Sequence, residues 1–183
     1  MRCKTSKGFP PVIDRHITTL ILGSFPSETS LAKAQYYGHP QNQFWRLAGR
    51  AIGVPLQAMA YEARLEALLA HRIGLWDVIG RCERLGSLDS AIRNATRNRF
   101  RRVTRVATDL RRVCFNGKTA GELEPWFAGQ GHETFVLPSS SPANTIAFAV
   151  KLRAWKRALA TGLASGRRIT AHRSPVTGHA AAC

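Results

Sequence analysis

A short polar stretch, residues 38–45, carries the side chains best suited to chemistry. It reads Gly-His-Pro-Gln-Asn-Gln-Phe-Trp. Pro40 disfavours helical backbone at His39, so we expect the chain to arrive extended and to begin a helix near Asn42. Polar groups at a helix N-terminus lie beside free N–H groups and the positive end of the helix dipole, which attract anions. On this stretch alone the simpler interpretation is structural, with Asn42 as a helix cap and the aromatic residues in the core.

Three other polar loops follow segments that are predicted to be buried strands. Strands that alternate with helices imply a mostly parallel sheet covered on both faces. The carboxyl ends of such strands meet at one edge, where open α/β sheets bind ligands. The loops are residues 23–27 (Gly-Ser-Phe-Pro-Ser), residues 116–117 (Asn-Gly) and residues 139–144 (Ser-Ser-Ser-Pro-Ala-Asn). Together with residues 38–45, they are expected to surround one crevice.

The elements that would position these loops are read from the spacing of apolar residues. Compact apolar runs predict buried strands, and apolar residues three or four positions apart predict amphipathic helices. Strands are expected at 18–22, 73–79, 112–116 and 134–137. Helices are expected at 27–33, from 42 to 52, at 61–71, from a cap at Ser87 into part of the arginine-rich segment that ends at Asp109, at 118–127 and at 148–159. The basic residues of the last helix, Lys151 among them, are expected on its solvent side.

Length and composition predict one folded domain. The chain has 183 residues, of which 44% are hydrophobic, enough for one well-buried core. We expect an irregular leader at 1–17, the domain at 18–161 and a basic, disordered tail at 162–183. The four cysteines show no metal-ligand spacing, so no metal or other cofactor is expected. Without an 18-residue apolar run or a signal peptide, the chain is expected to be cytoplasmic, away from membranes and monomeric.

The charge balance favours a polyanionic partner. The chain has 27 Lys and Arg against 11 Asp and Glu, which gives a formal net charge of +16. An arginine-rich proteome could produce such an excess as solvated surface alone. However, the arginines are concentrated in one segment that holds a single acid, Asp109, so we expect a nucleic-acid face there. They are Arg93, Arg97, Arg99, Arg101, Arg102, Arg105, Arg111 and Arg112.

Five separated motifs resemble those of the uracil-DNA glycosylase superfamily. They are residues 23–27, 36–45, 86–90, 115–117 and 137–144, and they occur in order between about residues 18 and 159. Within the superfamily the chain is most similar to the hypoxanthine-DNA glycosylase branch. The resemblance implies a three-layer α/β/α sandwich around a mostly parallel four-stranded sheet. It also implies a monofunctional enzyme that flips a nucleoside out of double-stranded DNA containing deaminated bases and cleaves its N-glycosidic bond.

Two departures from the superfamily pattern favour this branch. The first loop lacks the Asp or Asn that handles the attacking water in many members, and a serine run replaces the usual His-Pro-Ser-Pro loop. In the hypoxanthine branch, two catalytic asparagines would match Asn42 and Asn116. The resemblance further implies a base pocket and a DNA-binding loop. The pocket would comprise Gly23, Ser24, Phe25, Pro26, Tyr37, His39 and Phe44, and the loop would contribute Ser139, Ser140, Ser141, Pro142 and Asn144, the last also as a cap of the final helix.

The expected chemistry depends on stabilising charge. Breaking a purine N-glycosidic bond leaves positive charge on the sugar and negative charge on the base. An amide cannot act as a general base, but its oxygen can orient water and its N–H₂ group can donate to the base. We assign Asn42 to the water or sugar and Asn116 to the base, although these roles could be exchanged. Phe25 and Tyr37 are candidates to stack on the flipped base or to be core.

Other interpretations remain open from the sequence. His39 is either a surface residue or a charge-stabilising imidazole. Asp77 and Asp89 are the nearest acids for general base catalysis, but they lie off the proposed loops. A mismatch-specific uracil or thymine glycosylase of the same fold is the first alternative function, and a noncatalytic DNA-binding module is the second. The arginines at 97–112 and the basic side of the last helix are expected to bind the duplex.

Overall fold

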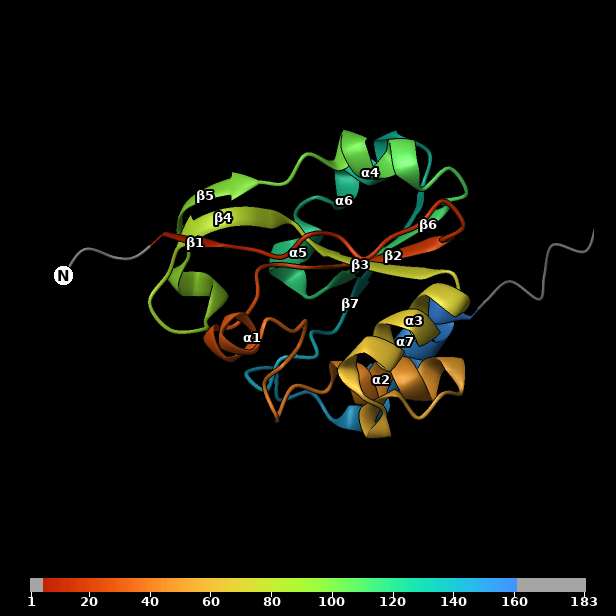
Figure 1. The fold of residues 1–183 in the computed structure, drawn as a ribbon, viewed down its shortest axis with the longest axis horizontal. Helices are drawn as coiled ribbons and strands as arrows, with labels where there is room; N and C mark the ends of the chain where they lie inside the picture. Colours follow the sequence, from red (N-terminus) through yellow and green to blue (C-terminus); the bar gives the residue numbers. More distant parts are fainter. Residues whose placement is uncertain (1–4, 161–183) are drawn as a thin grey trace, which may run out of the picture.

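The fold is organised around a four-stranded parallel sheet. We describe residues 5–160 of a computed structural model, shown in Figure 1. The strand order is β3-β2-β6-β7, in parallel register throughout. All residues of the neighbouring strands β2 and β3 are buried, as expected when helices cover both faces of a sheet. The strands are β2 Thr19–Gly23, β3 Ile73–Asp77, β6 Arg112–Asn116 and β7 Glu133–Leu137.

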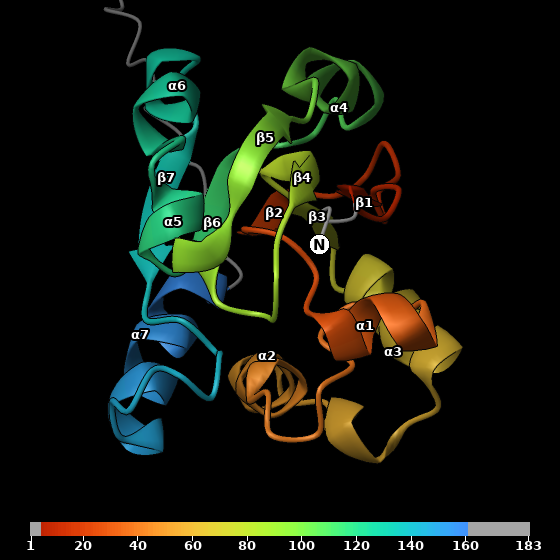
Figure 2. The ribbon, with the colours of Figure 1, turned by 90° about the vertical axis from the view of Figure 1, so that its left-hand side faces the viewer.

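Helices cover the two faces of this sheet and make two separate cores. Successive side chains of a strand point to opposite faces, so Leu20 and Leu22 pack into one core and Ile21 into the other. The first core is completed by α4 Phe100–Val106 and α6 Glu124–Gly129, and the second by α2 Phe44–Ile52, α3 Tyr61–Ala70 and α7 Phe148–Leu159. Figure 2 shows these helices on either side of the strands. The predicted three-layer α/β/α architecture is therefore confirmed.

Short elements complete the domain near the sheet. The helix α1 Glu28–Lys33 begins at Ser27, whose side chain accepts a hydrogen bond from the Ser30 N–H group. Two 3₁₀ turns follow, η1 Leu56–Ala58 and η2 Asp89–Ala91. The helix predicted at 118–127 is divided into α5 Lys118–Gly121 and α6, because Pro125, in the first turn of α6, has no N–H group to donate to the Gly121 carbonyl and so cannot continue the hydrogen bonds of α5.

A second, antiparallel sheet was not predicted. Its order is β1-β4-β5, formed by β1 Thr5–Lys7, β4 Ile79–Glu83 and β5 Arg93–Arg97. The strand predicted at 73–79 leaves the parallel sheet after Asp77 and continues as β4. The helix expected from Ser87 is instead η2 followed by β5. All five β5 residues are exposed, so this strand is held by its backbone pairing with β4. Because it buries no apolar side chains, the sequence contains no apolar pattern that would predict it.

The leader expected to be irregular at 1–17 also needs correction. Thr5–Lys7 form β1 and pair with β4, Val12 forms an isolated bridge to Leu75, and Ile17 is fully buried. The tail expected at 162–183 lies outside the described residues. No helix within residues 5–160 is long and apolar enough to span a membrane.

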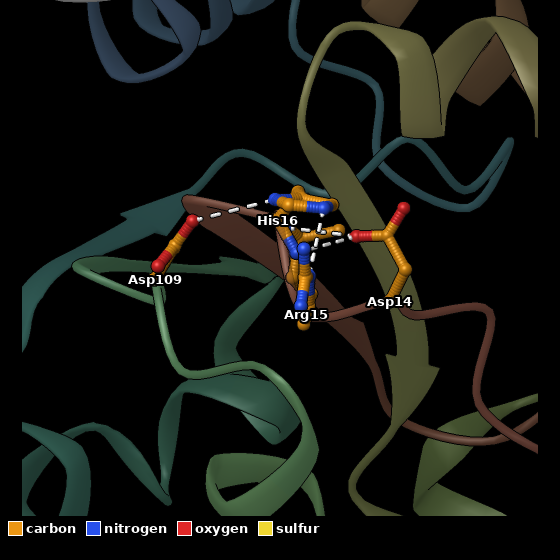
Figure 3. Close-up of polar contacts among 5 residues, drawn as sticks. Asp14, Arg15, His16 and Asp109 are labelled. Carbon is orange, nitrogen blue, oxygen red and sulfur yellow. Dashed lines mark hydrogen bonds and ion pairs between the residues drawn. The ribbon is translucent and has the colours of Figure 1, made fainter.

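The amino ends of the strands carry polar groups that satisfy one another. Figure 3 shows Asp14, whose carboxylate accepts hydrogen bonds from the backbone N–H groups of His16 and Ile17. The Arg15 guanidinium donates to Nε2 of His16, and Nδ1 of the same ring lies 3.7 Å from a carboxylate oxygen of Asp109. These contacts hold in place the segment that leads into β2.

Candidate active site

One cavity of about 300 Å³ lies at the carboxyl ends of the parallel strands. The loops that follow β2, β6 and β7 line it, as does Asp77 at the end of β3. Residues 36, 37 and 42, which precede α2, and residues 87–89 complete the wall. The three predicted loops and the polar stretch before α2 therefore surround a single crevice, and both Asn42 and Asn116 face it.

Asn116 is held rigidly at the end of β6. Only 9% of the residue is exposed. Its Oδ1 atom accepts a hydrogen bond from the backbone N–H of Ser140 at 2.8 Å, and its Nδ2 atom donates to Oγ of Ser140 at 2.8 Å. These bonds fix the orientation of the amide, because a backbone N–H can only donate. The other amide N–H of Asn116 makes no further hydrogen bond within the described residues, although this side chain lies close enough to the Tyr37 hydroxyl to oppose the rise in its pKa.

Asn42 is half-buried just before α2. Its Oδ1 atom accepts a hydrogen bond from the backbone N–H of Phe44, the first residue of α2, at 2.9 Å. The cap position itself is Gln43, so Asn42 supports the start of the helix from one residue before the expected place. Its amide N–H₂ group has no bond within the described residues, which leaves it free toward the cavity. The structural and the chemical interpretations of Asn42 are therefore compatible.

Ser140 connects the two asparagines. It is fully buried, bonds to Asn116 through its N–H and hydroxyl groups, and accepts a hydrogen bond from the Gln43 N–H at 3.0 Å. Gln43 directly follows Asn42, so one residue fixes the backbone beside one amide and the side chain of the other. The relative placement of Asn42 and Asn116 depends on this residue.

Lys151 strengthens the same connection from α7. Its ammonium donates to Oε1 of Gln43 at 3.1 Å and to the carbonyl oxygen of Asn144 at 2.8 Å. The residue is fully buried, and this burial lowers its pKa from the usual value. The expectation that Lys151 lies on the solvent side of the last helix was therefore wrong, because the helix packs against α2 along that side.

Asp77 is the main site residue that the sequence did not place. It is 3% exposed, it lines the cavity, and its Oδ2 atom has no hydrogen-bond partner within the described residues. Burial, and to a smaller extent the Asp89 carboxylate, raise the pKa of this carboxyl to about 7 against the opposing effect of the Arg84 guanidinium. The Tyr37 hydroxyl beside it is also buried without a partner, and burial raises its pKa.

Glycine at position 23 makes room for this pair. A Cβ atom there would lie 2.5 Å from Oδ1 of Asp77 and 3.0 Å from the Tyr37 hydroxyl oxygen. The other acid, Asp89, also lines the cavity, and its Oδ1 atom accepts a hydrogen bond from the Ser24 hydroxyl at 2.8 Å. The site thus combines amide donors, one buried carboxyl and one tyrosine hydroxyl. No cluster of three or more potential metal ligands occurs in the part of the chain that is described.

Comparison with known proteins identifies the family. Residues 10–161 match the model of the uracil DNA glycosylase superfamily. The chain belongs to this superfamily. The predicted resemblance is thereby confirmed, and the cavity at the carboxyl edge is the candidate active site of a uracil-DNA-glycosylase fold.

Individual relatives cover most of the chain. A protein of Methanosarcina acetivorans named hypoxanthine DNA glycosylase is 54% identical over 138 residues, which are 75% of this chain and 87% of the relative. A protein of the same name from Methanosarcina barkeri is 47% identical over 152 residues, 83% of this chain and 96% of the relative. A solution NMR structure of a candidate uracil DNA glycosylase from M. acetivorans superposes with a TM-score of 0.78 at 48% identity, covering 85% of this chain and 97% of its own.

The structure places most of the expected base-pocket residues in this superfamily site. Gly23, Ser24, Phe25, Pro26 and Tyr37 line the cavity. Two expected residues do not line it, and each has a structural role.

Phe44 is fully buried and stacks beneath Tyr37, with ring centroids 3.7 Å apart and planes 8° apart. His39 accepts a hydrogen bond from the backbone N–H of Gln41 at its Nδ1 atom. We therefore withdraw Phe44 and His39 from the base pocket. Tyr37, which Phe44 supports from behind, remains the stacking candidate from this segment.

The expected DNA-binding loop is only partly available to a ligand. Ser139, Ser141 and Asn144 line the cavity, whereas Pro142 does not. Ser140 also borders the cavity. Its N–H donates to Asn116 and its hydroxyl oxygen accepts from Asn116, so the contacts that the structure shows for it are to the asparagine, and its role toward a phosphate stays a prediction. Asn144 does not cap α7: its Oδ1 atom accepts from the Ile146 N–H at 3.0 Å, and α7 begins at Phe148.

Proposed function

We propose that the chain is a DNA glycosylase that hydrolyses the N-glycosidic bond of deoxyinosine, releasing hypoxanthine and leaving an abasic site. Two relatives that are 54% and 47% identical carry the name hypoxanthine DNA glycosylase. The observation that carries the proposal is that Asn42 and Asn116, 74 positions apart by their numbering, border one cavity. That cavity, of about 300 Å³, is in the size range of small-molecule sites.

The hydrogen bonds of the two amides support different roles. Each amide oxygen accepts one backbone N–H, but only the Asn116 amide is also fixed through its nitrogen, which donates to the Ser140 hydroxyl, so this side chain offers the cavity its second N–H in a fixed direction. A donor suits the departing base, which gains negative charge as the bond breaks. Asn42 retains a free N–H₂ group and a second lone pair on its oxygen, so it suits the attacking water or the sugar. A general base is not required for this division of roles.

Double-stranded DNA is the substrate form that the surface favours. The exposed β5 strand carries Arg93 and Arg97, and it begins next to η2 at the cavity wall. Arginines on such a surface contact phosphates without reading sequence. Arg112 does not belong to this face: its guanidinium pairs with Glu133 at 2.7 Å at the amino ends of the strands.

Two exposed leucines next to the cavity fit a flipping mechanism. Leu85 is 84% exposed and Leu88, which lines the cavity, is 59% exposed. Proteins that distort DNA insert apolar side chains between base steps, and this compensates for the lost stacking. The weaker pairing of a deaminated base lowers the cost of extrusion.

We place the enzyme in the cytoplasm as a monomer acting on duplex DNA that contains deaminated bases.

The decisive test is cleavage of duplexes that carry inosine, uracil or xanthine at one position, followed by alkali. We expect strand breaks at inosine and none before alkali treatment. Preferred cleavage at uracil would support the alternative, a mismatch-specific uracil or thymine glycosylase, which the name of the solution-structure neighbour favours. Salt-sensitive DNA binding without any abasic product, unchanged in Asn42→Ala, would support a noncatalytic DNA-binding module.

A further inference from the structure

The buried carboxyl of Asp77 has no structural task that explains its position. Unpartnered polar atoms in a protein interior lower the stability of the fold. Nevertheless Oδ2 of Asp77 is left without a partner at the cavity wall, and the Tyr37 hydroxyl is left unpartnered beside it. A residue that lowers stability in this way is understandable if a ligand completes its hydrogen bonds.

The surroundings of Asp77 are defined by every neighbouring element. Gly23 of β2 lacks a side chain and so leaves the carboxyl open. The tyrosine hydroxyls of the segment before α2 approach from one side, and burial with the Asp77 charge nearby raises the pKa of both Tyr36 and Tyr37. Arg84, at the end of β4, supplies the opposing positive charge, but its guanidinium donates to the Pro26 carbonyl and lies over the Phe25 ring.

The charge state of Asp77 decides what it can do to a bound base. An ionised carboxylate only accepts hydrogen bonds, and it would repel a leaving base that gains negative charge. A neutral carboxylic acid has one O–H donor and one acceptor. A 6-oxopurine offers a complementary edge, since its oxygen and N7 accept and its N1–H donates.

From this geometry we propose that Asp77 is a further catalytic residue, whose neutral carboxyl donates a hydrogen bond to the flipped 6-oxopurine and stabilises the leaving base. The inference rests on the proposed function. The C1′–N9 bond breaks with its electron pair going to the base. The water oxygen bonds to C1′, and the proton that this water loses neutralises the hypoxanthine anion. The Asp77 proton stays on the carboxyl throughout. The residue thus serves as a hydrogen-bond donor in a water-poor site.

The electrostatics of the pocket agree with this role. Burial raises the pKa of Asp77 to about 7, and the Asp89 carboxylate contributes to the rise. Half of the free enzyme molecules would therefore hold the proton near neutral pH. Above that value the donor disappears and a negative charge replaces it. Excision should then lose up to tenfold for each further unit of pH.

The test is the single-turnover excision rate on an inosine duplex between pH 5.5 and 9.5. Wild type should lose activity above about pH 7. Asp77→Asn, which keeps a donor and cannot ionise, should retain its rate to the alkaline end. Asp77→Ala should be at least tenfold slower than wild type at pH 6 and show no alkaline loss. An unchanged alkaline loss in Asp77→Asn, or a wild-type rate at pH 6 in Asp77→Ala, would overturn the proposal.

Asp89→Asn provides a second, independent test of the role of Asp77. It keeps an oxygen for the Ser24 hydroxyl but removes the charge that raises the pKa of Asp77, so the loss of activity at alkaline pH should begin at a lower pH.

The protonation of the Asp77 carboxyl can also be followed by carbon-detected NMR in the free protein, with Asp77→Asn to assign the signal. A carboxyl that is fully ionised at pH 6 contradicts the inference whatever the activity. An inosine duplex left uncut at every pH contradicts the proposed function instead.

Discussion

The two ends of the parallel sheet treat polar groups in opposite ways. At the amino ends, Asp14, Arg15, His16 and Asp109 bond to one another or to nearby backbone. At the carboxyl ends, the buried atoms without a partner are Oδ2 of Asp77, the Tyr37 hydroxyl and one guanidinium nitrogen of Arg84, and within residues 5–160 all such atoms lie on this side. The amino edge is built for stability, whereas the carboxyl edge keeps its hydrogen-bonding capacity for a ligand.

Substitutions at the two edges should therefore affect different properties, stability at one edge and activity at the other. Changes at the carboxyl edge should reduce excision, and some should stabilise the protein. Changes at the amino edge should reduce stability and leave the excision rate of the folded protein unchanged.

The largest expected effect is on stability, from Asp77→Asn. The pKa of Asp77 is raised from 3.8 to about 7 on folding, so the folded protein keeps a proton that the unfolded chain releases. Wild-type stability should therefore fall as pH rises from about 4 to 7. The variant should be more stable than wild type at pH 8, by up to about 4 kcal/mol, and show a much smaller gain near pH 4. Urea unfolding at both pH values measures this, and an equal gain at both would contradict it.

Next is the loss of excision in Asn42→Ala, which we expect to be about 10²–10³-fold. The same substitution removes the acceptor for the Phe44 N–H and should cost about 1 kcal/mol of stability. Asn42→Ser is the matched control, because serine also caps helices but is too short to replace the amide. It should retain most of the stability and lose the activity in rapid-quench assays. If the serine variant were fully active, Asn42 would have a structural role at the start of α2 and no role in catalysis.

Arg112→Ala tests the amino edge. The guanidinium bonds to Glu133 and to the carbonyl oxygens of Ala158 and Ala160 at 2.8 and 3.0 Å, where α7 ends. Its removal should cost about 2 kcal/mol in urea unfolding. Arg111→Ala, in the exposed neighbouring residue, should change stability little. A slower single-turnover rate of folded Arg112→Ala would break the separation of the two edges.

The smallest effect is expected from the leucines beside the cavity. Replacing Leu85 and Leu88 together by serine should slow excision from duplex DNA about tenfold, equivalent to about 1.4 kcal/mol, because no apolar side chain would then fill the gap left by the base. Excision from single-stranded DNA should change less. Val106→Ser removes another exposed apolar side chain, which lies on α4 and is 46% exposed, and it should leave excision from both substrates unchanged. Equal slowing on both substrates would argue against insertion.

The sequence predicted the central layer well because its signals are local. The apolar run of β2, all of whose residues are buried, and the spacing of Phe148, Leu152 and Trp155 in α7 reflect burial directly. Parallel strands must share an edge, so the meeting of Asn42 and Asn116 followed from topology without any knowledge of distances.

The misses have equally physical causes. Strand β5 is exposed along its whole length, so pairing with β4 defines it and its own residues do not. Asp77 was placed inside a strand that was expected to run to Ile79. The parallel pairing ends at Asp77 itself, which moves its side chain from the interior of a strand to the wall of the crevice. The roles of Ser140 and Lys151 depend on contacts between distant segments, for which the sequence contains no signal.

The passage of the chain from β3 directly into β4 limits how this protein can diverge. Asp77 in the crevice and Leu85 outside it are joined by an extended ribbon that is anchored by β2 on one sheet and by β1 on the other. Inserting or deleting one residue in this ribbon would turn its side chains to the opposite face. Insertions and deletions among descendants should therefore occur mainly at Gly86, which has a φ of +76° and where an added Cβ atom would meet no other atom within 4 Å.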